Sequence, residues 1–186
     1  MNIISNIKKL KLKESAVTIG KFDGVHRGHD SLLSMLKNDP LTKVVFTFDA
    51  KKGTPLEAEG SICSNSRKIE LLAKYEPDYI IFFRFGRLEA AMSPRRFVKS
   101  LLVKRLGMKR IYVGPDFRLG RKGKGDIALL KELGTRYGFE VVVHEKVTYD
   151  GKDISSTRIH NEIKEGHYDK AYAMLGHTED IEKQDR

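Results

Sequence analysis

Five short apolar runs, each followed by a segment with helical spacing or a turn-rich loop, constrain the fold of this chain more than any other feature. Each run is continuous and rich in branched and aromatic residues, which is typical of parallel strands covered on both faces. The runs lie at residues 16–19, 43–48, 79–83, 110–113 and 140–143. Regular alternation of strand and helix predicts an α/β domain with a parallel sheet and right-handed crossovers.

The segments between the runs carry the start and stop signals of helices. Ser93 caps one helix that Gly107 ends, and Asp126 caps another that Gly138 ends. Helical spacing also covers residues 30–37, 66–75 and 159–164. We therefore expect about five parallel strands with helices on both faces of the sheet.

The length of 186 residues suits one domain, which we expect to span residues 1–176, with 177–186 as a charged tail. No apolar run approaches the roughly 20 residues of a membrane span, and the N-terminus lacks the apolar stretch of a secretory signal. The single cysteine, Cys63, cannot form an internal disulfide, so a reducing cytoplasm is the expected setting.

The charge balance favours anionic partners, because 35 Lys and Arg stand against 25 Asp and Glu, a formal net charge of +10. The basic residues are scattered along the chain, and no aromatic-rich RNA signature accompanies them. Small phosphorylated molecules are therefore the expected partners, in preference to nucleic acid, and no membrane is expected as a partner. The sequence indicates no oligomeric state.

A pair of histidines, His26 and His29, follows the first apolar run in the pattern His-x-Gly-His. The pair stands where a helix begins and presents unpaired backbone N–H groups, which readily bind phosphate. Two imidazoles there can donate hydrogen bonds to phosphate oxygens as charge builds, and Gly28 allows close approach of a ligand. The pattern predicts attack on a nucleotide phosphate without a covalent enzyme intermediate; the alternative is a plain strand–helix junction with two solvated histidines.

A second motif, residues 155–158 with the sequence Ser-Ser-Thr-Arg, precedes another amphipathic helical turn. One interpretation is an ordinary helix cap, since serines are strong caps. The functional interpretation is a second phosphate site, in which hydroxyls, free amides and Arg158 bind a leaving pyrophosphate.

A third motif is the glycine-rich loop at residues 114–120, which continues into the basic segment 121–126. It matches neither a P-loop nor a Rossmann fingerprint. It is either a flexible basic loop or a mobile flap over a nucleotide. All three motifs follow strands, and ligands of parallel sheets bind at the carboxyl ends of strands, so we expect the motifs to meet in one cleft.

These motifs together resemble the adenylyltransferase domain of the bacterial bifunctional riboflavin kinase/FMN adenylyltransferase family, over roughly residues 14–176. The resemblance rests on residues 20–29, 47–49, 113–120, 125–126 and 154–159. It implies a Rossmann-like nucleotidyltransferase fold. The implied reaction joins FMN to the AMP part of ATP with Mg²⁺, giving FAD and pyrophosphate.

The resemblance also implies site residues. The catalytic residues it implies are His26, His29, Ser156, Thr157 and Arg158. The implied ATP-binding residues are Gly20, Lys21, Phe22, Asp23, Gly24, Gly28, Ser155 and His160, and the flavin-binding residues are Phe48, Asp116, Phe117 and Arg118. No metal ligand is indicated. Because the acceptor phosphate is already ionised, catalysis would rest on alignment and charge neutralisation.

The sequence departs from the family at three places. After Phe48, residues 49–53 lack the proline and histidine that the family has there, and His160 replaces an arginine. Because arginine keeps its charge and histidine is largely neutral at pH 7, weaker binding of the ATP phosphates is expected. Past Gly176 there is no room for the family's riboflavin kinase domain, so we expect no phosphorylation of riboflavin.

Three alternatives remain open. The acceptor could be another phosphorylated molecule, such as pantetheine phosphate, nicotinate mononucleotide or glycerol phosphate. The altered segment after Phe48 and His160 also fit a catalytically degenerate domain that binds flavin or nucleotide without turnover. The positive charge alone suggests a nucleic-acid binder, whose affinity would fall steeply with salt.

Overall fold

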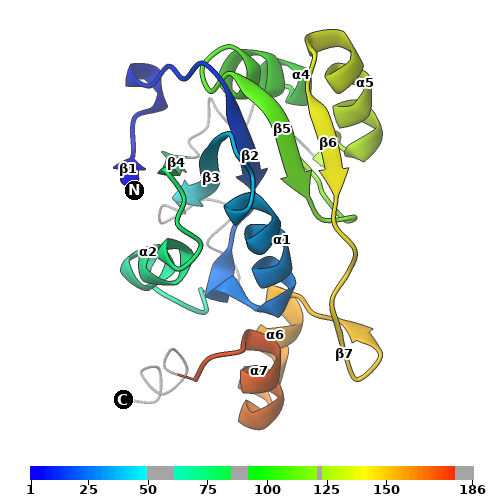
Figure 1. The fold of residues 1–186 in the computed structure, drawn as a ribbon. Coiled ribbons are helices and arrows are strands. Elements are labelled where there is room, and N and C mark those ends of the chain that lie inside the picture. The colour runs from blue at the N-terminus through cyan, green and yellow to red at the C-terminus, as the bar shows by residue number, and fades with distance from the viewer. Residues whose placement is uncertain (50–60, 85–91, 121–122, 179–186) are drawn as a thin grey trace.

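The sheet at the centre of the molecule is parallel and has six strands. The computed structural model describes residues 1–49, 61–84, 92–120 and 123–178 (Figure 1). The strand order is β1-β4-β3-β2-β5-β6, and every neighbouring pair is parallel. The strands are β1 Asn2–Ile4, β2 Ser15–Ile19, β3 Thr42–Asp49, β4 Tyr79–Arg84, β5 Met108–Val113 and β6 Glu140–Val143. The α/β class and the five predicted strands are confirmed.

The sequence analysis did not predict β1, which pairs with β4 at one edge of the sheet. Its three residues are too short a run to stand out, and Ile3 is half exposed. A small hairpin of β7 (Thr148–Tyr149) and β8 (Lys152–Asp153) was also not predicted.

The predicted helices are all present, and their caps form as expected. The helices are α1 Arg27–Lys37, α2 Asn65–Ala73, α4 Pro94–Phe97, α5 Ile127–Tyr137, α6 Ser156–Lys164 and α7 Tyr168–Leu175, with short helical segments η1 Ile7–Lys9, η2 Asp23–Val25 and the π-helical η3 Val98–Val103. The side chains of Ser93 and Asp126 accept hydrogen bonds from Arg96 and Leu129 backbone N–H groups. Only α7 lies beyond the helices that the sequence analysis expected.

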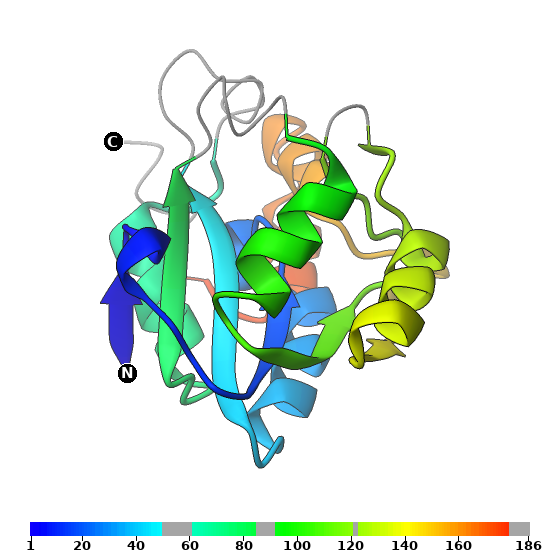
Figure 2. The ribbon, with the colours of Figure 1, turned by 90° about the horizontal axis from the view of Figure 1, so that it is seen from above.

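Successive residues of the central strands enter two separate cores, which is why the strands read as continuous apolar runs. Val17 and Ile111 pack with α4, η3 and α5, whereas Ala16 and Tyr112 pack with α1 and α2. Figure 2 shows these two groups of helices on opposite sides of the sheet. The expectation that both faces are covered is confirmed.

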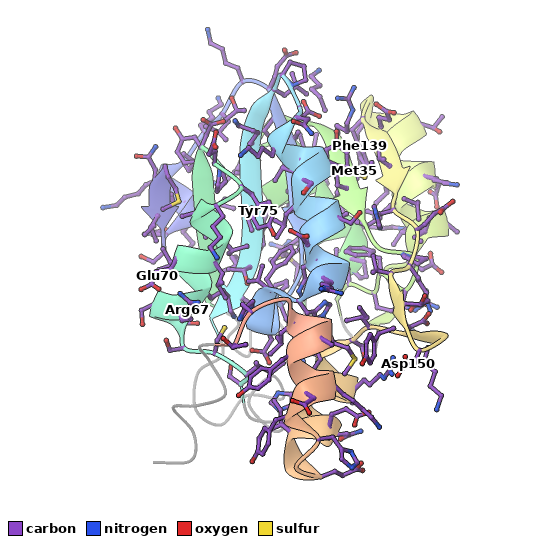
Figure 3. All side chains as sticks on the ribbon, turned by 60° about the horizontal axis from the view of Figure 1, so that its bottom comes forward. Met35, Arg67, Glu70, Tyr75, Phe139 and Asp150 are labelled. Atoms are coloured by element: carbon purple, nitrogen blue, oxygen red, sulfur yellow. The ribbon has the colours of Figure 1, made fainter. Side chains whose placement is uncertain are left out.

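A third, smaller apolar cluster joins α6 and α7 beyond the sheet. Ile62 and Ile154 pack there against Ile159, Met174 and Leu175. In Figure 3, α7 lies beyond the start of α1, at the end of the molecule where the central strands finish. This cluster fixes the start of α6 near the start of α1.

The strand order creates a switch point between β2 and β5. From β2 the chain proceeds to β3 and β4 on one side, and it then returns to β5 on the other side of β2. In open parallel sheets, ligands bind outside the carboxyl ends of the strands at such a point. Two of the three predicted motifs follow β2 and β5 directly.

Two segments of interest lie outside the described residues: the altered residues 50–53 and most of the expected tail, residues 179–186. Within the residues that the structure describes, no helix is long and apolar enough to cross a membrane.

Candidate active site

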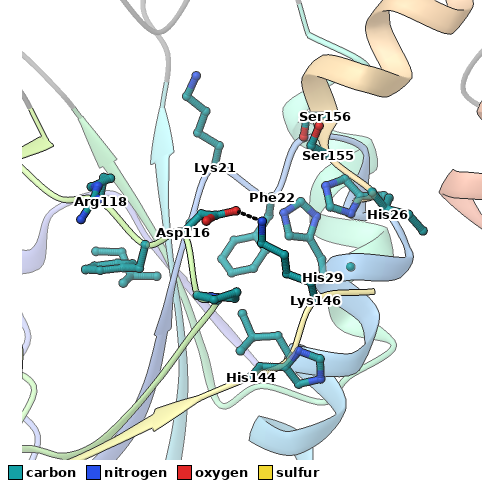
Figure 4. Close-up of a pocket in the computed structure, with 18 of the residues that line it drawn as sticks. Lys21, Phe22, His26, His29, Asp116, Arg118, His144, Lys146, Ser155 and Ser156 are labelled. Atoms are coloured by element: carbon teal, nitrogen blue, oxygen red, sulfur yellow. Dashed lines mark ion pairs between the residues drawn. The ribbon is translucent and has the colours of Figure 1, made fainter. Parts of the chain in front are cut away.

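A cavity of about 640 Å³ lies over the carboxyl ends of the central strands, within the usual size of a small-molecule site (Figure 4). All three motifs contribute to its wall, as the sequence analysis expected. Among the residues singled out from the sequence, those lining it are Gly20, Lys21, Phe22, His26, Gly28, His29, Phe48, Asp116, Phe117, Arg118, Ser155 and Ser156.

His26 and His29 form the most distinctive part of the wall. His26 is the N-cap residue of α1, and its carbonyl accepts the backbone N–H of His29 at 2.7 Å. The two imidazole rings stack with their centroids 3.7 Å apart and an interplanar angle of 18°. The ring of Phe22 meets His29 edge-on, with centroids 5.1 Å apart. The rings therefore fix each other's orientation.

Burial keeps both imidazoles neutral. Desolvation lowers the pKa of His26 from 6.5 to about 4, although the nearby Asp23 carboxylate opposes that shift. Desolvation also lowers the pKa of His29 well below its ordinary value, and His26 and Lys68 add to the effect. Among the described residues, neither Nδ1 atom has a hydrogen-bond partner. Two neutral imidazoles with unused polar atoms thus stand at a cavity, which is typical of a functional site.

The loop before His26 adopts a strained backbone. Phe22 and Val25 have φ values of +48° and +39°, and Gly24 has +71°. A branched residue such as Val25 rarely adopts this left-handed region. Gly20 lies against the buried Phe22 ring, because a Cβ atom there would approach the ring to 3.3 Å. Strain of this kind persists where the surrounding structure imposes it, often at functional sites.

The N-termini of α1 and α6 meet at the cavity. A Cβ atom on Gly28 would approach the His26 ring to 3.1 Å and the Ile154 carbonyl to 3.6 Å. The hydroxyl of Ser155 accepts the Arg158 backbone N–H at 3.2 Å, and the hydroxyl of Ser156 donates to the Asp23 carbonyl at 3.2 Å. Two helix N-termini with free backbone N–H groups can bind anions such as phosphates.

The other side of the cavity is formed by Phe48 and the loop after β5. A turn closes this loop, with the Phe117 N–H donating to the Gly114 carbonyl at 3.1 Å. Asp116 forms an ion pair with Lys146 at 2.7 Å, and Arg118 forms one with Asp126 at 3.6 Å. This side combines aromatic surface with charge, which suits a ring-shaped ligand that carries phosphate.

Three residues singled out from the sequence lie behind the wall and not in it. Asp23 accepts hydrogen bonds from the Ile62 N–H at 2.9 Å and the Ser61 hydroxyl at 2.8 Å. His160 contacts the second oxygen of Asp23 at 3.4 Å, and the Gly24 carbonyl lies 2.7 Å from His177 Nε2. Asp23, Gly24 and His160 therefore brace the strained loop, and the contact of His160 with ATP phosphates stays a prediction.

Arg158 and Thr157 also lie outside the cavity lining. The guanidinium of Arg158 donates to the carbonyls of Tyr149 and Lys152, both at 2.8 Å, and to that of Asp153 at 3.3 Å. It also stacks over the Tyr149 ring at 5.7 Å. Arg158 thus holds the β7–β8 hairpin, and its contact with pyrophosphate stays a prediction. Thr157 is exposed in the first turn of α6.

The glycine-rich loop is closed by a pair of backbone hydrogen bonds. Leu119 and Gly125 exchange these bonds at 2.7 and 2.8 Å, and Gly123 donates to the Gly120 carbonyl at 3.0 Å. A Cβ atom on Gly125 would approach Pro94 to 2.8 Å, so glycine is needed for this close packing. Arg121 and Lys122, the centre of the proposed flap, lie outside the described residues.

Four polar residues of the lining were missed by the sequence analysis: His144, Glu145, Lys146 and Asp153. The first three directly follow β6, and His144 contacts the hydroxyl of Ser31 on α1. The position of these three immediately after a predicted strand is the signal that could have identified them.

The described residues contain one group of three side chains that could hold a metal ion, Glu162, Glu165 and His167. None of the three lines the cavity.

Comparison with known proteins gives a consistent picture. The family model described as FAD synthetase matches residues 8–158. A bifunctional riboflavin kinase/FMN adenylyltransferase of Buchnera aphidicola subsp. Schizaphis graminum is 38% identical over 185 residues, a match that covers 93% of this chain and 58% of the relative. The chain therefore spans a little under three fifths of that relative's length.

Two solved structures share the fold. A macrolide-efflux protein of Streptococcus pneumoniae matches with a TM-score of 0.79 and 25% identity, over 95% of this chain and 61% of that one. A pantoate–β-alanine ligase of Francisella tularensis matches with a TM-score of 0.57 and 18% identity, over 89% and 78% of the two chains. The second likeness concerns the fold alone.

Proposed function

The chain belongs to the FAD synthetase family, and on that premise we propose that it transfers the adenylyl group of ATP to FMN, giving FAD and pyrophosphate. The observation that carries the proposal is the meeting of two helix N-termini beside His26 and His29, in a cavity whose other side is aromatic. The side with the histidines and the helix N-termini suits a polyphosphate, and the aromatic side suits a flavin.

The reaction needs no residue that accepts a proton. An ionised oxygen of the FMN phosphate attacks the α-phosphorus of ATP, and the bond from that phosphorus to the bridging oxygen breaks. Pyrophosphate leaves with that electron pair. The protein's contribution is to align two anionic groups and to stabilise charge on the transferring phosphorus.

His26 and His29 supply hydrogen bonds in this account. A neutral imidazole carries one N–H donor, and both rings are neutral at pH 7 because burial lowers their pKa values. Their mutual stacking holds these donors in place before substrate binds. Preorganised donors in a site shielded from water stabilise developing charge more strongly than mobile ones.

The start of α6 binds the leaving pyrophosphate in this account. Ser155 and Ser156 line the cavity there, and the backbone N–H groups of Ser156 and Thr157 belong to the first turn of the helix. We assign Arg158 a supporting role, because its guanidinium already binds three carbonyls of the β7–β8 hairpin that leads to Ser155.

The described part of the chain offers no cluster of metal ligands in the cavity, since Glu162, Glu165 and His167 lie elsewhere. Mg²⁺ commonly binds through substrate phosphates with few protein ligands. We propose that Mg²⁺ enters with the phosphates of ATP, and no step here is routed through it.

The partners in this proposal are small nucleotides and flavins. The scattered positive charge favours anions in general, and no stripe for nucleic acid accompanies it. We propose a reducing cytoplasm as the setting, because the lone cysteine, Cys63, cannot form an internal disulfide.

The proposal is tested by mixing the purified chain with FMN, ATP and Mg²⁺ and separating the flavins by chromatography. FAD and an equal amount of pyrophosphate should appear. The same assay with pantetheine phosphate, nicotinate mononucleotide or glycerol phosphate, and with CTP in place of ATP, tests other acceptors and donors. Transfer to one of those acceptors without FAD formation would overturn the proposal, as would flavin binding without pyrophosphate release.

A further inference from the structure

The Asp116–Lys146 ion pair lies between the two sides of the cavity. Asp116 follows β5, Lys146 follows β6, and the pair joins the two loops at 2.7 Å. In Figure 4 it lies between Arg118 on one side and His26, His29, Ser155 and Ser156 on the other. Lys146 also forms an ion pair with Asp153, at the end of the hairpin that leads to Ser155.

Few cations line the histidine side of the cavity, since the Lys68 that acts on His29 is buried outside the lining. Both imidazoles are neutral, and Arg158 is bound to the hairpin outside the lining. The described lining residues carry three cations, Lys21, Arg118 and Lys146. In the view of Figure 4, Lys21 and Arg118 extend away from the histidines, whereas the ammonium of Lys146 lies close to the middle of the cavity.

The carboxylates beside Lys146 keep it charged and in place. Hydrogen bonds to Asp116 and Asp153 raise the pKa of Lys146 above its ordinary value. The Lys146 side chain is 37% exposed and lines the cavity, so a phosphate can reach it. A phosphate entering between the two sides would be repelled by Asp116 and Asp153 unless the cation between them turned toward it.

We propose that Lys146 is a substrate-binding residue that receives the phosphate of the acceptor at the boundary between the two sides of the cavity. When the acceptor binds, the ammonium of Lys146 gives up part of its contact with Asp116 and Asp153 and contacts the phosphate monoester instead. It thereby reduces the repulsion between that phosphate and the nucleotide phosphates that it must approach. The inference rests on the proposed function, because it takes FMN as the acceptor.

The test compares binding of FMN with binding of riboflavin, which lacks the phosphate, by isothermal titration calorimetry without ATP. The unaltered chain should bind FMN more tightly than riboflavin. Lys146→Met should weaken FMN binding about tenfold, the lower end for a charge-assisted hydrogen bond because the side chain is partly exposed, and should leave riboflavin binding unchanged. Lys146→Arg should retain most of the FMN affinity.

Lys152→Met is the matched control, since it removes the same charge from an exposed position on the neighbouring hairpin outside the cavity lining. It should bind both flavins as the unaltered chain does. When FAD formation from FMN and ATP is measured, Lys146→Met should raise the KM for FMN about tenfold and change the KM for ATP less than about twofold.

Equal affinity of Lys146→Met and the unaltered chain for FMN would overturn the inference. An equal loss of affinity for FMN and for riboflavin would also overturn it, because it would show that the ion pair only maintains the shape of the cavity. A failure of the proposed function is distinct. In that case the unaltered chain forms no FAD, even though the difference between FMN and riboflavin binding is measurable.

Discussion

The stacked rings of His26 and His29, with centroids 3.7 Å apart, link the strained loop after β2 to the first turn of α1. Neither ring can turn without moving the other, and Phe22 meets His29 edge-on. The pair is therefore a rigid set of donors at the cavity wall, and its consequences can be measured.

Replacing either histidine should nearly abolish FAD formation while the fold survives. Loss of one preorganised donor commonly raises a barrier by about 3–4 kcal/mol, so His26→Asn or His29→Asn should slow turnover by a factor of roughly 10²–10³. Steady-state rates at saturating FMN and ATP measure this. His167→Asn, at an exposed position outside the cavity, is the control and should retain full activity. Near-normal turnover in either cavity variant would refute the assigned role.

Stability should depend on pH through His26. Its pKa is about 4 when folded and about 6.5 when unfolded, so between these values the unfolded chain binds a proton that the folded chain does not. The contribution of His26 to the free energy of unfolding should therefore be constant above pH 6.5 and fall by about 3 kcal/mol as pH drops from 6.5 through 4. Urea unfolding at several pH values measures this, and His26→Asn should reduce the slope. An unchanged slope in that variant would show that His26 is not the buried neutral group.

Gly28→Ala should separate activity from stability. Alanine in the first turn of α1 has a better helix propensity than glycine, by up to about 1 kcal/mol. Its Cβ atom would, however, lie 3.1 Å from the His26 ring and force that ring to move. Because the displaced ring offsets the gain in helix propensity, we expect an unfolding midpoint close to that of the unaltered chain, with FAD formation reduced about tenfold. Thermal unfolding and turnover of the same preparation give both values, and unimpaired turnover would contradict the packing argument.

Arg158 should act through the hairpin and not through its charge alone. Arg158→Lys keeps the positive charge but loses the guanidinium whose N–H groups bind several carbonyls. It should therefore destabilise the fold by about 1–3 kcal/mol, nearly as much as Arg158→Met does. Denaturant unfolding of both variants measures the difference. Full stability of Arg158→Lys would instead favour a purely electrostatic role for this residue.

His160→Arg tests the family difference directly. The side chain of His160 lies against Asp23, behind the cavity wall. We therefore expect a KM for ATP within about twofold of that of the unaltered chain, because position 160 faces Asp23 and not the cavity. A large fall in that KM would show that position 160 reaches the phosphates after all.

The fold and the position of the site could be predicted from the sequence because their signals are local. Continuous apolar runs mark strands buried on both faces, and His26, His29, Ser155 and Ser156 stand beside helix caps that a few residues specify. Parallel strands then bring those segments to one edge. The three-residue β1 was missed because edge strands are short, and α7 because the break at Glu165 and Gly166 looks like the end of a helical region.

The direction of individual side chains could not be predicted, because it depends on partners far apart in the sequence. Arg158 stands beside Ser155 in the chain, yet its guanidinium turns to the carbonyls of the β7–β8 hairpin. Asp23 lies within the first motif and nevertheless serves as an acceptor for Ser61 and Ile62. Lys146 belongs to no motif and reaches the cavity because β6 lies next to β5.

The central claim is direct transfer of an adenylyl group from ATP to FMN within this cavity. The most direct measurement follows ATP that carries radioactive phosphorus at its α-phosphate, incubated with the purified chain, FMN and Mg²⁺. We predict that the label appears in the flavin fraction as FAD, that none becomes attached to the protein, and that His29→Asn slows the transfer by a factor of roughly 10²–10³. Label that stays in ATP despite flavin binding, or label found on the protein, would contradict the account.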